Sequence, residues 1–170
     1  MLNCSKKERK NLKTMFEFNN ENMILDESVK SDAEKCKNQM NLLYGHMLKY
    51  KYVKDNQLSS WVGTILNSCN EIKKDSQNKT NIKHLIDDDR NLSYKKGLEI
   101  AQKDNPTVKF PKSINDANSD NGNWFTFDSD TIINNPNFIK EFLIKNKSNS
   151  DSIEKSLEKH FNEDEYFRGK

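Results

Sequence analysis

Alternating lysines and tyrosines give one short stretch of this chain the side chains best suited to bind a ligand. The stretch contains Lys49, Tyr50, Lys51, Tyr52 and Lys54. Lysines interleaved with aromatic rings can bind phosphates while nucleic-acid bases stack on the rings. Lysines also favour the C-terminal end of a helix, where they face the negative end of its dipole, and the tyrosines would then close a core. The stretch therefore predicts either a binding patch for a macromolecule or the end of a helix.

Three residues around this stretch could together line a polar pocket. His46 precedes it, and Trp61 and Thr64 follow it. A histidine in such a pocket can act as a general base, which would make the protein a hydrolase. The residue types favour another interpretation, in which Trp61 is a core residue whose indole N–H finds one partner and His46 lies at the core or its rim. We assign all three to the structural core, with catalysis by His46 as the alternative.

A second concentration of chemically active side chains is acidic. In the segment "HLIDDDR", His84 and Asp88 lie four residues apart, so on a helix both could face one metal ion. Zinc and two-metal sites need three or more ligands, and no third ligand has suitable spacing. A solvated acidic turn is the simpler interpretation, and a hydrolase using His84 and Asp88 stays as an alternative. The sequence shows no glycine-rich phosphate loop or nucleophile motif, so we predict no catalytic residue, no metal ion and no cofactor.

The composition limits both the fold and the classes of function. The 170 residues are enough for one domain with a modest core, since 33% of them are hydrophobic and 32% are charged. Only 5 glycines and 3 prolines are present, which disfavours an all-β fold with many tight turns. The net charge of +2 does not by itself indicate a nucleic-acid-binding protein.

The sequence also predicts a cytoplasmic protein without a membrane segment. No apolar run approaches the roughly 20 residues that span a bilayer, and the charged N-terminal segment lacks the apolar region of a secretory signal. Cys4, Cys36 and Cys69 are odd in number and widely spaced, and they form no disulfide framework. Reduced thiols of this kind are typical of a cytoplasmic protein.

Two runs of apolar residues repeat every three or four positions, which is the spacing of one helix face. We predict helices near 27–54 and 59–76, joined by a short polar connection as a long antiparallel hairpin. The first run is also narrow enough for a self-associated coiled coil, so a homodimer is an alternative. The first run is Val29, Ala33, Cys36, Met40, Leu43, Met47 and Tyr50, and the second is Leu58, Val62, Ile65, Cys69 and Ile72.

The remaining segments are expected to complete an all-α helical bundle. Further helices are predicted near 80–103, 136–146 and 150–163, and the segment "DDDRN" within the first of these is either an exposed helical face or a break. We expect a single helical domain over residues 1–147. An amphipathic helix and a charged tail follow over residues 148–170.

Residues 104–134 show no helical period, and we predict a long irregular loop there. Such a loop is unusual in a compact domain unless it is anchored or functional. Its aromatic residues Trp124, Phe125 and Phe127 either form a segment that docks a partner or anchor the loop on its own helical core. The stretch around them could also be a short strand.

The segment around these lysines and tyrosines also resembles a known family. The segment "LLYGHMLKYKYVKDNQLSSWVGTI" resembles the hallmark of a bacterial all-α family of unknown function, number twenty-nine in the unknown-function series. The resemblance covers about residues 38–111, with Tyr50 in place of the tryptophan of the family. It implies an all-α fold and no particular chemistry. The matching positions are His46, Leu48, Lys49, Tyr50, Tyr52, Ser60, Trp61, Thr64 and Ile65.

Taken together, these features predict a non-enzymatic interaction protein. We expect a small bacterial, phage or mobile-element regulator or inhibitor that binds a host protein, for example a host defence nuclease complex. A nucleic-acid-binding protein is the first alternative, using the lysine and tyrosine patch with Lys73 and Lys74. An unrecognised hydrolase is the second alternative.

Overall fold

The computed structural model describes residues 30–53, 58–76, 80–119 and 122–146. Every regular element within these ranges is a helix, so the prediction of an all-α fold is confirmed. None of the described helices is long and apolar enough to cross a membrane. The described part of the first helix covers residues 30–52, and the others are α2 (Leu58–Ser76), α3 (Thr80–Asp88), α4 (Arg90–Asp104), α5 (Ile114–Asn118), α6 (Ser129–Asn134) and α7 (Pro136–Lys145).

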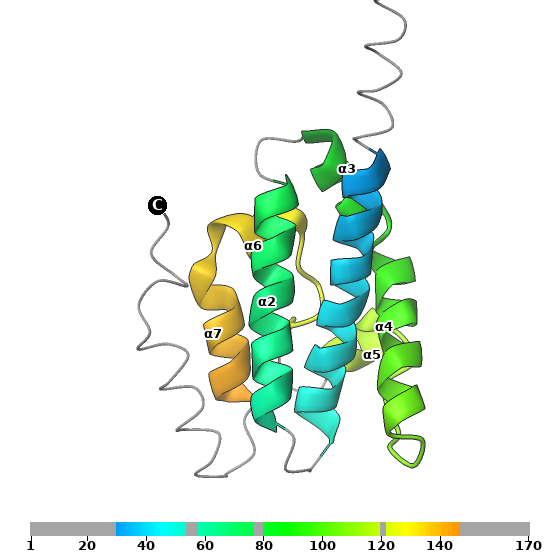
Figure 1. Ribbon diagram of the computed structural model, residues 1–170. Coiled ribbons are helices and arrows are strands. Elements are labelled where there is room, and N and C mark those ends of the chain that lie inside the picture. Colours follow the sequence, from blue (N-terminus) through cyan, green and yellow to red (C-terminus); the bar gives the residue numbers. More distant parts are fainter. Residues whose placement is uncertain (1–29, 54–57, 77–79, 120–121, 147–170) are drawn as a thin grey trace, which may run out of the picture.

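The first helix and α2 are the long helices that the two apolar runs predicted. They run in opposite directions along the bundle (Figure 1). The described members of the first run, from Ala33 to Tyr50, are all buried. In α2, Val62, Ile65 and Ile72 are buried as well, and Cys69 packs against the same core from a half-buried position. The periodically spaced residues therefore form the core-facing side of both helices.

The first helix also runs alongside α4, and the two point in the same direction (Figure 1). Lys37 forms an ion pair with Asp89, just before α4, and Lys49 forms an ion pair with Asp104, the last residue of α4. Since the positions advance by similar numbers along both helices, the two contacts define a parallel alignment. Ionic contacts therefore fix both ends of this helix pair.

The helix expected over 80–103 is two helices. A turn at Asp89 separates α3 from α4, so the segment "DDDRN" is a break in the helix. The carboxylate of Asp87 accepts hydrogen bonds from the backbone nitrogen and hydroxyl of Ser129, at 2.7 and 3.1 Å. The break thus turns two carboxylates toward other elements, because Asp89 pairs with Lys37 and Asp87 holds the first residue of α6. Asp88 and His84 are exposed.

The expected long loop at 104–134 is more regular than predicted, since it contains α5 and α6. Each of these short helices begins with a side chain that caps a backbone N–H. The hydroxyl of Ser113 accepts from the backbone nitrogen of Asp116, and the carboxylate of Asp128 accepts from that of Thr131. Helices of 5 and 6 residues are too short to show a period in the sequence. The stretch around Trp124 forms a turn and no strand.

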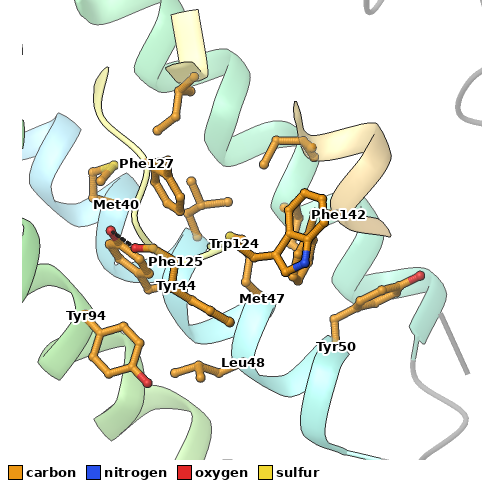
Figure 2. Packing of buried hydrophobic residues seen from close by; sticks show 14 of the residues in the cluster. Met40, Tyr44, Met47, Leu48, Tyr50, Tyr94, Trp124, Phe125, Phe127 and Phe142 are labelled. Carbon is orange, nitrogen blue, oxygen red and sulfur yellow. Dashed lines mark hydrogen bonds between the residues drawn. The ribbon is translucent and has the colours of Figure 1, made fainter. Parts of the chain in front are cut away.

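The aromatic residues of this segment lie inside the protein (Figure 2). Trp124, Phe125 and Phe127 are all buried. The ring of Phe127 stacks on that of Tyr44 with 4.9 Å between centroids, and the hydroxyl of Tyr44 donates a hydrogen bond to the carbonyl of Phe125. Tyr94 meets Tyr44 edge to face at 5.6 Å. The aromatic residues therefore anchor this segment on the core of the same chain, which is one of the two interpretations offered by the sequence.

The last described helix, α7, begins with Pro136 in its first turn, where the missing N–H of proline leaves no helix hydrogen bond unmade. The side chain of Asn135, which precedes the helix, forms no capping hydrogen bond. The helix predicted near 150–163 and the tail over 148–170 lie outside the described residues.

Candidate functional site

Five residues near the end of the first helix form the candidate site, and we call them the hallmark cluster. They are His46, Lys49, Tyr50, Lys51 and Tyr52. All lie within two turns of one helix, so their side chains point in several directions around it. Each direction meets a different part of the structure. The chemistry available to the cluster therefore depends on the partner that each side chain meets.

Lys49 points into the protein, toward the end of α4. Its ammonium group donates a hydrogen bond to Oδ2 of Asp104, and only 4% of its side chain is exposed, against 54% for the carboxylate partner. The hydrogen bond from Lys49 is the main cause that lowers the pKa of Asp104 below its usual value. The pair therefore places a charged ammonium inside the protein and its counter-ion at the surface.

His46 lies one turn earlier and is half-buried. Its Nδ1 is 3.0 Å from the carbonyl oxygen of Leu42, and since a carbonyl only accepts, Nδ1 carries the hydrogen. Burial is the largest influence on the ring and lowers the pKa of His46, and the nearby charge of Lys49 lowers it further. The carbonyl of Leu42 and the carboxylate of Asp104 act in the opposite direction. His46 is thus a neutral imidazole at pH 7.

Tyr50 connects the first helix to α7. Its side chain is buried, and its hydroxyl donates a 2.8 Å hydrogen bond to the carbonyl of Leu143. Burial raises the pKa of the Tyr50 hydroxyl, so it stays protonated as a donor. Its ring also packs against Phe142, with centroids 5.8 Å apart. Tyr50 thus holds the last turn of α7 against the core.

Lys51 and Tyr52 connect the same helix to α5. Both donate hydrogen bonds to the carbonyl of Ala117, Lys51 at 3.0 Å and Tyr52 at 3.4 Å. The ammonium of Lys51 also lies 5.2 Å from the centre of the Tyr52 ring and 5.6 Å from that of Phe125. Both residues are half-buried. The cluster therefore joins one helix to three distant segments, which contain Asp104, Ala117 and Leu143.

The family model of the domain of unknown function DUF29 matches residues 13–125, which is more than half of the chain. The chain belongs to this family. No curated protein and no solved structure matches the chain.

The DUF29 match is longer than the resemblance found in the sequence, because it begins at residue 13 and ends at residue 125. It includes the whole hallmark cluster and two of its three contact segments, at Asp104 and Ala117. The contact at Leu143, like α6 and α7, lies beyond the match.

The other predicted site residues are placed as follows. Trp61 is buried, whereas Thr64 is half-buried and donates a hydrogen bond to the carbonyl of Ser60 in its own helix. Lys54 lies outside the described residues. Across the part of the chain that the structure describes, no three His, Cys, Asp or Glu side chains come together as a metal site would require.

Sequence reasoning did not find the partners of the cluster. Asp104, Ala117 and Leu143 lie 55, 66 and 93 residues from the side chains that contact them, and no spacing rule covers such distances. The sequence analysis also did not single out Gly97 of α4, whose Cβ position lies against the backbone of Gly45 in the first helix. An isolated glycine within a helical pattern often marks such a close packing contact.

Proposed function

We propose that this DUF29 chain acts without catalysis, by binding a partner protein on its outer surface. The observation that supports the proposal is that the side chains of the hallmark cluster make their hydrogen bonds within the chain. Lys49, Tyr50 and Lys51 each donate a hydrogen bond to an acceptor in a distant segment of the same chain, so the residues best suited to chemistry stabilise the fold. A braced helical bundle offers other proteins a fixed array of side chains on its outer helices, which is a common mode of recognition.

The proposed setting is the cytoplasm of a bacterium, with the protein acting as a regulator or inhibitor. Cys36 and Cys69 are not joined in a disulfide within the part of the chain that the structure describes, as is usual in a reducing compartment. A small protein of this kind inhibits by occlusion, because it covers a surface that its partner needs. A host defence nuclease complex, encountered by a phage or mobile element, is one partner class that fits this mode of action.

The two alternatives have less support. Lys49 cannot contact a phosphate in this conformation because it is 3% exposed, and Lys51 is engaged with Ala117. Binding of nucleic acid through the lysine and tyrosine patch would break these internal contacts. For the hydrolase alternative, His84 and Asp88 are both exposed, and surface exposure does not supply the dry site in which a general base is most effective.

Purification of the tagged full-length chain from its native cells tests the proposal. We expect it to elute with one protein at a fixed stoichiometry, with an absorbance ratio that shows no nucleic acid. His46→Gln and Asp88→Asn should leave that complex unchanged. Elution with nucleic acid alone, or elution as a single chain or homodimer under all conditions, would contradict the proposal.

A further inference from the structure

We draw no further inference here: the strongest candidate, the surface patch around the exposed Leu92 on the outer side of α4, is bordered by polar and charged side chains such as Asn91 and Lys95, and nothing in the structure shows what covers it.

Discussion

Gly97 of α4 lies against Gly45 of the first helix without space for a side chain between them. A Cβ on Gly97 would lie 2.7 Å from the backbone nitrogen of Gly45 and 2.6 Å from the Cβ of Tyr44. This close approach lies between the ionic contacts at the two ends of the helix pair, Lys37 with Asp89 and Lys49 with Asp104. Helix α4, whose outer face is mostly charged, is thus held by backbone proximity as well as by its few apolar side chains.

Gly97→Ala should therefore destabilise the protein, although alanine is the better helix former. The added methyl meets backbone atoms that cannot rotate away, so the helices must separate, and we expect a loss of about 1–3 kcal/mol in the free energy of unfolding. Gly63→Ala is the matched control, since nothing lies within 4 Å of its Cβ position. It should raise the free energy of unfolding by up to about 1 kcal/mol. Urea denaturation compares the two, and similar values would refute the close helix contact.

The Lys49–Asp104 pair makes a second prediction, because its two members are not equally buried. Asp104→Ala leaves an ammonium group almost without solvent or counter-ion. We expect a cost of about 1–3 kcal/mol, below that of a fully buried pair because the carboxylate is 54% exposed. Lys49→Met replaces the ammonium with an apolar side chain of similar length and should cost less than about 1 kcal/mol.

Glu99→Ala on the same helix supplies the control for this pair. Glu99 pairs with Lys96 at the surface, where both side chains are 53% exposed, so its loss should change the free energy of unfolding by less than about 0.5 kcal/mol. Chemical denaturation at pH 7 measures all three variants. If Lys49→Met proves as costly as Asp104→Ala, the ion pair contributes net stability, and the two residues do not differ in the way that their unequal burial predicts.

The lowered pKa of His46 predicts a loss of stability on mild acidification. Burial holds the pKa of His46 below its usual value of 6.5 in the folded protein. Between the two values the unfolded chain binds more protons than the folded protein, so the free energy of unfolding falls as the pH falls. The slope from one such group is at most about 1.4 kcal/mol per pH unit.

His46→Gln should remove this part of the pH dependence between pH 7 and pH 5. His84→Gln, at an exposed histidine, should leave it unchanged. Denaturant midpoints at the two pH values test the expectation, and an undiminished slope in His46→Gln would show that other groups cause it.

The sequence was most informative where one element repeats a pattern over several turns. The apolar runs from Ala33 to Tyr50 and from Val62 to Ile72 predicted two long helices, because the spacing of their residues reflects burial along a single face. The all-α fold and the family followed from the same region. Helix α5 could not be found this way, since a helix of 5 residues makes little more than one turn.

The candidate site was harder to predict because the role of each side chain depends on contacts with residues that are distant in the sequence. The residue types of Lys49 and Tyr50 fit either a binding patch or a helix end. Only the positions of Asp104 and Leu143 show that both side chains point inward. In the same way, the sequence of the segment around Phe125 does not reveal whether its rings face a partner or the core of the same chain.

The hydrogen bond from Tyr50 to Leu143 predicts that α7 is coupled to the first helix through one hydroxyl. The carbonyl of Leu143 lies in the last turn of α7, where helix carbonyls lack the usual backbone partners. Tyr50→Phe keeps the ring against Phe142 but removes the donor to a buried acceptor. We expect a loss of about 1–3 kcal/mol, concentrated in α7.

Native-state hydrogen exchange of the full chain can locate this effect. In Tyr50→Phe, the amides of α7 should exchange roughly tenfold or more faster, as a local loss of about 1.4 kcal/mol implies, while those of α2 change less. Tyr52→Phe is the control, because its 3.4 Å hydrogen bond goes to Ala117 of α5 and Lys51 donates to the same carbonyl. Its loss should leave exchange in α7 unchanged. Equal acceleration of α2 and α7 in Tyr50→Phe would mean that the hydroxyl supports the whole core rather than the attachment of one helix.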